Sequence, residues 1–232
     1  MISSKPSEDS QPTLEYLSAQ LSSPNVKDRV LAMIELQKET MPAQVAYPLI
    51  QKALKDETIQ VRGMAAFSLG IKPTSESLSE LIQILATDTD HNVRAMAAGA
   101  LGYLGDPEAL NALCHAFFED TDWLVQFSAA ISLGNLKDPQ AITVLLKALE
   151  RDRPLLQEAA VIALGEIGAV EQVHRILAFV SSSDWMMRKR VADALGNLTC
   201  PQSQSALRYL STDVNPQVAA AATVALERLE AS

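Results

Sequence analysis

The stretch DTDHNVRAMAAGALG (residues 88–102) recurs along the chain with its spacing and its final glycine kept. Four more copies are DETIQVRGMAAFSLG (56–70), DTDWLVQFSAAISLG (120–134), RDRPLLQEAAVIALG (151–165) and SSDWMMRKRVADALG (182–196). Their closing glycines follow one another at intervals of 32, 32, 31 and 31 residues. A fixed period of this length is typical of repeat proteins, in which each copy is one supersecondary unit.

Two degenerate copies extend the series at its two ends. RVLAMIELQ (29–37) and AAAATVALE (219–227) keep the register, but a polar residue replaces the final glycine. About seven units result. Because repeat units stack on their neighbours, we expect one continuous array over residues 13–232. Residues 1–12 are polar, contain two prolines and have no apolar run, which predicts a disordered tail.

Each copy has the pattern of the second helix of a helix pair. Apolar side chains recur at helical spacing, with small alanines between them that allow close packing; in one copy they are Val93, Ala97, Ala100, Leu101 and Leu104. The run PEALNALCHAFF (107–118) is amphipathic and starts after Asp106, as a first helix would. No alternating strand pattern is present. We therefore predict an all-α fold, a right-handed α-solenoid of about seven helix pairs, with closing glycines such as Gly102 in left-handed caps.

Composition excludes several classes of function. The net charge of −9 argues against nucleic acid as a partner, because phosphate binding needs clustered Lys and Arg. We find no signal peptide and no apolar stretch long enough to cross a membrane, so a cytoplasmic protein without membrane insertion is expected. The two cysteines lie in different repeats and the three histidines share no spacing, so we predict neither a disulfide framework nor a metal site.

An acidic residue in the turn and an arginine six positions later recur in several copies. Asp56 with Arg62 and Asp88 with Arg94 follow this pattern. Stacked copies could join these groups into a ladder of charge-assisted hydrogen bonds. Gln126 and Gln157 replace the arginine in the middle copies, where we expect the ladder to weaken.

The phrase VRAMAAGALGYLGDPEAL (93–110) resembles the short HEAT repeat of the phycobilisome lyases, and the resemblance covers residues 20–230. Such a chain is similar to the non-bleaching type B phycobilisome degradation proteins. That resemblance implies binding to phycobiliprotein subunits (phycocyanin or allophycocyanin) and detachment of phycocyanobilin, which would be a ligand or substrate and not a permanently bound cofactor. The chain is also similar to the small subunit of heterodimeric phycocyanobilin lyases, which implies bilin attachment with a partner. A non-enzymatic interaction scaffold is a further alternative.

Alignment of the copies separates constant columns from variable ones. The constant columns, predicted to form the core, are Val61, Val93, Val125, Leu156, Met187 and Leu69, Leu101, Leu133, Leu164, Leu195. The variable columns are Gly63, Ala95, Phe127, Glu158, Lys189, Ala220 (column A) and, four residues later, Phe67, Gly99, Ile131, Ile162, Asp193, Val224 (column B). Positions i and i+4 share a helix face, so both columns are predicted to be free of packing constraints on the concave side of the second helices.

We predict a ligand or partner groove along these columns. Its residues are His91, Tyr103, Trp123, Phe127, Ile131, Glu158, Lys189 and Asp193. Aromatic faces, carboxylates and a cation suit a bilin, a conjugated chain of pyrroles with two propionates. Detachment by β-elimination would need a base and an acid, for which Glu158 and Asp193 are the candidates. Enzymatic activity, the catalytic residues and the oligomeric state stay open.

Overall fold

The computed structural model describes residues 12–230, and within them all regular structure is helical. Fourteen α-helices and two short 3-10 helices occur in this range, with no strand. The predicted all-α class is confirmed. The chain divides between Ala112 and Leu113 into two compact units, called unit 1 and unit 2 below. The single array over residues 13–232 stays a prediction, and the predicted tail, residues 1–12, lies outside the described residues except for Pro12.

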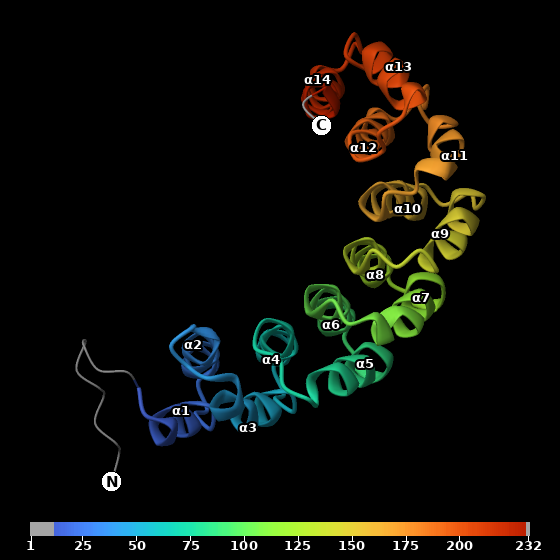
Figure 1. Ribbon diagram of the computed structural model, residues 1–232. Coiled ribbons are helices and arrows are strands. Elements are labelled where there is room, and N and C mark those ends of the chain that lie inside the picture. Colours follow the sequence, from blue (N-terminus) through green and yellow to red (C-terminus); the bar gives the residue numbers. More distant parts are fainter. Residues whose placement is uncertain (1–11, 231–232) are drawn as a thin grey trace. The chain divides into compact units, whose positions relative to one another are not determined.

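Unit 1 holds three complete helix pairs (Figure 1). They are α1 (Leu14–Gln20) with α2 (Val26–Gln37), α3 (Ala43–Ala53) with α4 (Ile59–Ile71), and α5 (Ser77–Thr87) with α6 (His91–Leu104). A 3-10 turn, Pro107–Ala109, and the first residues of α7 (Leu110–Glu119) end the unit. The second helices α2, α4 and α6 pack on one another in chain order.

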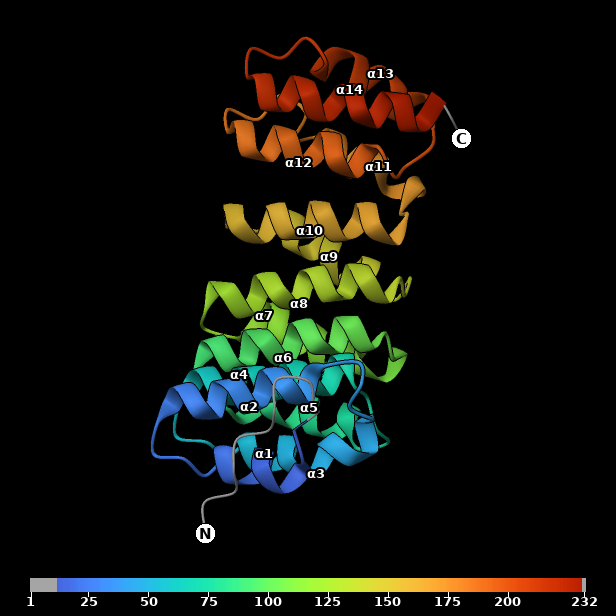
Figure 2. The same cartoon turned by 90° about the vertical axis from the view of Figure 1, so that its left-hand side faces the viewer.

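Unit 2 continues the same alternation. Its helices are the rest of α7 with α8 (Trp123–Leu136), α9 (Ala141–Leu149) with α10 (Pro154–Ile167), α11 (Val173–Leu177, after a 3-10 turn at Val170–Gln172) with α12 (Trp185–Leu195), and α13 (Pro201–Leu210) with α14 (Pro216–Glu230). Figure 2 shows α8, α10, α12 and α14 as successive parallel rungs. Within unit 2, the even-numbered helices thus form one layer and the odd-numbered helices the other. The described residues contain seven helix pairs, in agreement with the predicted number of about seven.

The two constant columns form the core, as predicted. All ten of their side chains are buried, none with more than 4% of its surface exposed. Removal of a Val or Leu side chain from water contributes roughly 1.5–3 kcal/mol, so one such pair stabilises each copy.

The closing glycines have a different role from the predicted one. Gly102 lies inside α6, and Gly196, which follows α12, has a right-handed φ of −64°. The left-handed residues come three positions after closing glycines, at Gly105, Lys137 and Gly168, with φ of 70°, 53° and 78°. The prediction of left-handed caps at the closing glycines was therefore wrong.

These glycines instead let neighbouring second helices approach closely. A Cβ built on Gly165 would lie 2.7 Å from Ala194 Cα, and one built on Gly70 would lie 2.9 Å from Ala100 Cα. Distances this short force the backbone to move, so only glycine permits the observed spacing between successive second helices.

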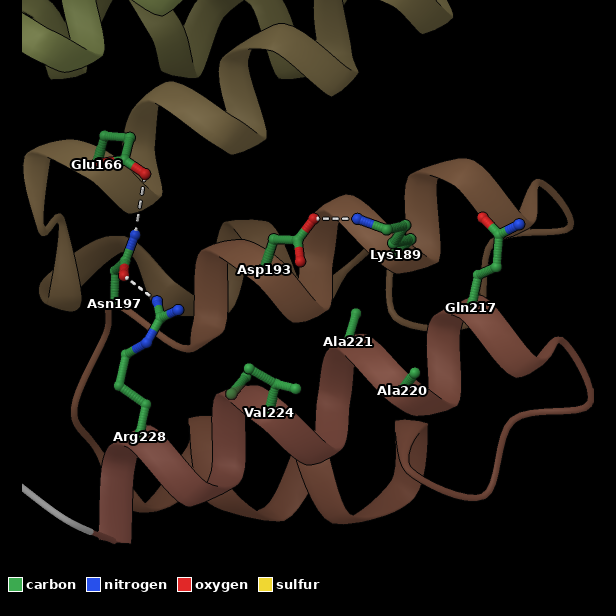
Figure 3. A pocket seen from close by; sticks show the side chains of 10 residues that line it. Glu166, Lys189, Asp193, Asn197, Gln217, Ala220, Ala221, Val224 and Arg228 are labelled. Atoms are coloured by element: carbon green, nitrogen blue, oxygen red, sulfur yellow. Dashed lines mark hydrogen bonds and ion pairs between the residues drawn. The ribbon is translucent and has the colours of Figure 1, made fainter.

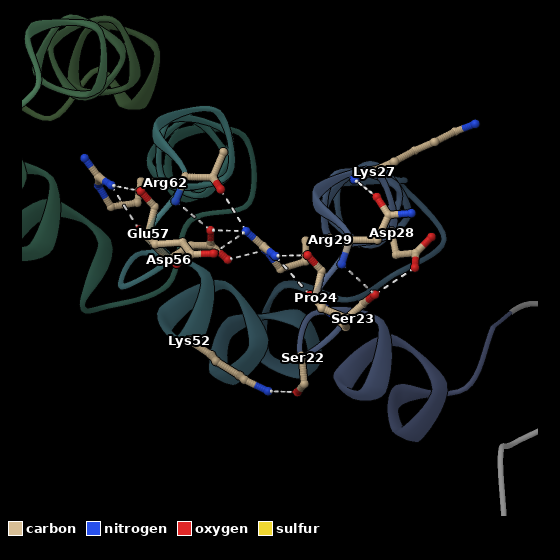
Figure 4. A network of polar contacts seen from close by, with 12 residues as sticks. Ser22, Ser23, Pro24, Lys27, Asp28, Arg29, Lys52, Asp56, Glu57 and Arg62 are labelled. Atoms are coloured by element: carbon tan, nitrogen blue, oxygen red, sulfur yellow. Dashed lines mark hydrogen bonds and ion pairs between the residues drawn. The ribbon is translucent and has the colours of Figure 1, made fainter.

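The predicted ladder of arginine and aspartate is present. Arg62 donates through Nη1 to the carbonyl of Asp56 in its own turn (3.0 Å) and pairs through Nε and Nη2 with Asp88 of the next copy (3.0 and 3.2 Å). Arg29 does the same with the carbonyl of Ser23 (2.9 Å) and the carboxylate of Asp56 (2.8 Å), as Figure 4 shows. Each arginine thus joins a turn to the following copy.

The ladder changes at the middle copies, where glutamine replaces arginine. Gln126 keeps the bond to its own turn, donating to the carbonyl of Asp120 at 2.7 Å. Its amide oxygen accepts a hydrogen bond from Arg153 of the next copy at 2.9 Å. Gln157 likewise donates to the carbonyl of Leu149 at 3.0 Å. A single charge-assisted hydrogen bond therefore replaces the bidentate ion pair at Gln126.

Candidate functional site

Two residues of column A, Gly63 and Glu158, lie against the next second helix. The missing side chain of Gly63 leaves room for Met96 of the next second helix, whose Sδ would be 2.7 Å from an added Cβ. Glu158 is buried, with 7% of its surface exposed, and faces Arg190 of the next second helix. Column A therefore contacts the following helix at Gly63 and Glu158, and the prediction that packing leaves this column free is wrong for these two positions.

Column B is the exposed one. Phe67 and Val224 expose 41% and 55% of their surfaces, Gly99 is exposed, and Ile131, Ile162 and Asp193 are half-buried. Large apolar side chains on a face without a packing partner mark a contact surface. The prediction of a free stripe thus describes column B.

The predicted groove residues fall in both units. His91 and Tyr103 lie at the start and near the end of α6 in unit 1, and Tyr103 exposes 68% of its surface. The other six lie in unit 2, where they occupy separate places: Trp123 and Phe127 line a pocket at the start of α8, and Lys189 and Asp193 line a cleft beside α12. Within unit 2, the structure therefore divides the predicted groove into an aromatic part and a charged part.

The aromatic pocket lies where α8 and α10 begin. Asp122 caps α8 by accepting a hydrogen bond from the amide of Leu124 at 2.8 Å, which places Trp123 in the first turn with 54% of its surface exposed. Phe127, Pro154 and Leu155 complete the apolar wall. The pocket has a volume of about 250 Å³. That is below the roughly 300–1,000 Å³ of small-molecule sites, so it suits an anchoring side chain better than a whole ligand.

The charged part is a cleft between α12 and α14 (Figure 3) with a volume of about 570 Å³, which is sufficient for a small organic ligand. Its floor is apolar, formed by Ala220, Ala221, Val224 and Ala225 of α14. Charged and amide side chains form its rim: Glu166, Lys189, Asp193, Asn197, Gln217 and Arg228. An apolar floor with a few polar groups is the usual composition of a ligand site.

Two sets of polar contacts organise the rim. Lys189 pairs with Asp193, one helical turn later, at 2.8 Å. Asn197 donates to Glu166 Oε1 at 3.2 Å and accepts from Arg228 Nη1 at 3.1 Å, so a row of hydrogen bonds joins α10, the turn after α12, and α14 (Figure 3). The sequence prediction did not include Arg228. The signal was available, because Arg228 lies four residues after Val224 and so extends column B by one turn in the last copy.

Glu158, on α10, is the buried carboxyl among the predicted groove residues. Burial raises its pKa, with a further increase from the negative charge of Asp184 and an opposing effect from Arg190. The Nε atom of Arg190 lies 4.0 Å from Glu158 Oε2, beyond hydrogen-bond distance. A carboxyl in such surroundings holds its proton more readily than an exposed one, but Glu158 lines neither the aromatic pocket nor the cleft.

Other kinds of site find no support in the described residues. Residues 12–230 contain no group of three or more His, Cys, Asp or Glu side chains arranged to hold a metal ion. In the same range, no helix has both the length and the apolar composition needed to cross a membrane.

The chain is similar in structure to a chain of the complex of CpcE and CpcF, the phycocyanin lyase of Nostoc sp. PCC7120. The two share 26% sequence identity at a TM-score of 0.64, over 82% of this chain and 77% of that one. The Escherichia coli protein YibA shares the fold, with a TM-score of 0.58 and 15% identity over 95% of this chain and 93% of its own. No curated protein sequence matches the chain significantly.

The sequence itself matches a family of repeat proteins. The family of HEAT repeats matches residues 78–165 and 144–227, which together span more than half of the chain. This agrees with the helix pairs, the constant apolar columns and the glycine contacts described above. The chain belongs to the HEAT-repeat family.

Proposed function

We propose that this chain is a bilin-handling protein that acts on the bond between phycocyanobilin and a phycobiliprotein. The observation that carries the proposal is the similarity to the phycocyanin lyase complex, which extends over most of both chains. The exposed second-helix layer of unit 2 supplies chemistry that agrees with it. It carries an aromatic pocket and a cleft of ligand size.

Each feature has a role in this proposal. The cleft between α12 and α14 holds the bilin, with its pyrroles over Val224 and the alanines and its propionates at the charged rim. The pocket of Trp123 and Phe127 takes an apolar side chain of the phycobiliprotein. Addition of a cysteine thiol across a double bond of the bilin forms a C–S bond and moves the thiol proton to a bilin carbon, and cleavage of the thioether reverses both changes. Asp193, which lines the cleft, is the candidate to relay this proton, whereas Glu158 lies outside both linings.

The same site serves both directions of the reaction. A catalyst stabilises one transition state, so it accelerates formation and cleavage of the thioether alike, and the free energy of the bound and released bilin sets the direction. The structural similarity to a lyase favours attachment together with a second subunit. Detachment during phycobilisome degradation, with phycocyanin or allophycocyanin as the source of bilin, is the second candidate.

The test is to follow covalent bilin on phycocyanin in both directions. Purified protein is mixed with holo-phycocyanin, or with apo-phycocyanin and free phycocyanobilin, alone and together with CpcE or with CpcF of the Nostoc lyase. Absorbance and a zinc-stained denaturing gel measure the bilin that is bound covalently. We expect a gain or a loss of covalent bilin, reduced by Phe127→Ala and Trp123→Ala. The control is Tyr209→Ala, which removes an aromatic side chain that is 60% exposed on α13 in the other layer.

The outcomes separate the alternatives. A gain that requires one of the Nostoc chains identifies a lyase subunit, whereas loss from holo-phycocyanin identifies a detaching protein. No change in any mixture would contradict bilin handling and would leave a scaffold that binds proteins through its second helices.

A further inference from the structure

The cleft between α12 and α14 has a cation at each end. Lys189 lies in the first half of α12, across from Gln217, and Arg228 lies in the last turn of α14, across from Asn197 (Figure 3). Six residues of α12, or about 9 Å along its axis, separate Lys189 from the last residue of the helix, Leu195, and Asn197 follows two residues later. The two cations are therefore separate attachment points on either side of Val224.

Each cation is already oriented by its own surroundings. Lys189 is held by Asp193 in a pair whose side chains are 29% and 42% exposed. Arg228 donates to Asn197, whose amide is fixed in turn by Glu166. Partly exposed pairs of this kind contribute little to stability. An incoming anion can therefore take over the ammonium group of Lys189 at a small cost, and Asp193 is then released as an acceptor for N–H groups of the ligand.

The apolar floor of the cleft determines which part of a ligand can lie between Lys189 and Arg228. Ala220, Ala221 and Val224 present only methyl groups toward the cleft, so the middle of the ligand must be apolar on the side that faces α14. A ligand with one carboxylate would satisfy only one end.

We propose that the cleft recognises a dicarboxylate with an apolar, extended body, in which Lys189 binds one carboxylate and Arg228 the other. Resting on the proposed function, the ligand is phycocyanobilin and the two carboxylates are its propionates. Arg228 is then a specificity residue of the site.

The test compares phycocyanobilin with its dimethyl ester, which has the same conjugated body and no negative charge. Binding to the full chain is titrated by absorbance for the wild type and for Lys189→Gln and Arg228→Gln. Arg208→Gln is the matched control, because it removes the same charge as Arg228→Gln from an exposed position of α13, outside the cleft. We expect the wild type to prefer the diacid by at least about tenfold, and each cleft variant to lose most of its affinity for the diacid but little for the ester.

The results that overturn the proposal differ from those that overturn the proposed function. Equal binding of diacid and ester, or an unchanged preference in both cleft variants, refutes the dicarboxylate site even if covalent bilin changes on phycocyanin. A preference that depends on Lys189 and Arg228 supports the site even if no covalent change occurs. Absence of binding to either compound refutes it outright.

Discussion

Two polar rows link successive helix pairs in unit 2, and they differ in burial. The first is the bidentate pair of Arg188 and Asp213, at 2.7 and 2.9 Å, with side chains 13% and 7% exposed. The second is the row of Glu166, Asn197 and Arg228, which are all exposed. Since loss of one partner is costly only where the other stays buried, the first row stabilises the stack and the second is free to change partners.

The largest effect is expected from breaking the buried row. Asp213→Ala leaves Arg188 buried without its carboxylate and should lower the free energy of unfolding by about 3 kcal/mol. Thermal or urea unfolding followed by circular dichroism measures this. Arg228→Gln, in the exposed row, is the control and should change stability by less than about 0.5 kcal/mol. Equal losses in the two variants would contradict the distinction between the rows.

A slightly smaller effect is expected where the helices touch. Gly165→Ala forces a methyl group to within 2.7 Å of the backbone of Ala194 and should destabilise the protein by about 1–3 kcal/mol. Gly99→Ala is the matched control, because Gly99 is also inside a second helix but has no atom within 4 Å of an added Cβ. Since alanine favours helix, that change should stabilise by about 0.5–1 kcal/mol. Changes of opposite sign in the free energy of unfolding of the two variants would support the role of Gly165 as a helix-contact glycine. Changes of the same sign would refute it.

These contrasts show which properties a repeated sequence reveals. Residues such as Val93 and Leu101 could be assigned to the core because every copy places the same apolar type there, and burial depends mainly on that periodicity. The role of Gly165 could not be predicted in this way, because a glycine that ends a helix and a glycine that allows helix contact occupy similar sequence positions. The three-residue offset to the real left-handed positions depends on backbone angles.

The site was predicted less completely for a related reason. Phe127 and Lys189 were included in the predicted groove because their column varies, but a variable column can be free or can match its neighbour, as Glu158 matches Arg190. Which of the two holds depends on the packing between copies and not on any single copy. Arg228 was missed because its copy is degenerate and lacks the closing glycine that marks the others.

A smaller, pH-dependent effect distinguishes two carboxyls of unit 2. The hydrogen bonds from Arg188 lower the pKa of Asp213, so its contribution to stability is present above the ordinary carboxyl range and is lost as pH falls through the lowered value. Burial and Asp184 raise the pKa of Glu158 against the effect of Arg190, so its charge opposes folding at neutral pH and this cost disappears on acidification.

Glu158→Gln tests the second half of this pair. We expect the variant to be more stable than the wild type at pH 8, with a difference that shrinks as pH falls toward the ordinary carboxyl value of about 4.5. Unfolding curves at a series of pH values measure it, with Asp213→Asn as the variant of opposite trend. A Glu158→Gln protein that is less stable than the wild type at pH 8 would show that the charged form of Glu158 is favoured by Arg190 more than it is penalised by burial.

The smallest change in stability is expected in the exposed row. Asn197→Ala removes the amide that holds Arg228 and contacts Glu166, and because all three side chains are exposed it should change the free energy of unfolding by less than about 0.5 kcal/mol. If Arg228 binds a ligand carboxylate, however, loss of its orientation should weaken phycocyanobilin binding by about threefold, less than removal of the charge itself. Asn135→Ala is the control, since Asn135 occupies the same repeat position on α8 outside the cleft. Absorbance titration measures both variants, and equal affinities would show that the row plays no part in orienting Arg228 for a ligand.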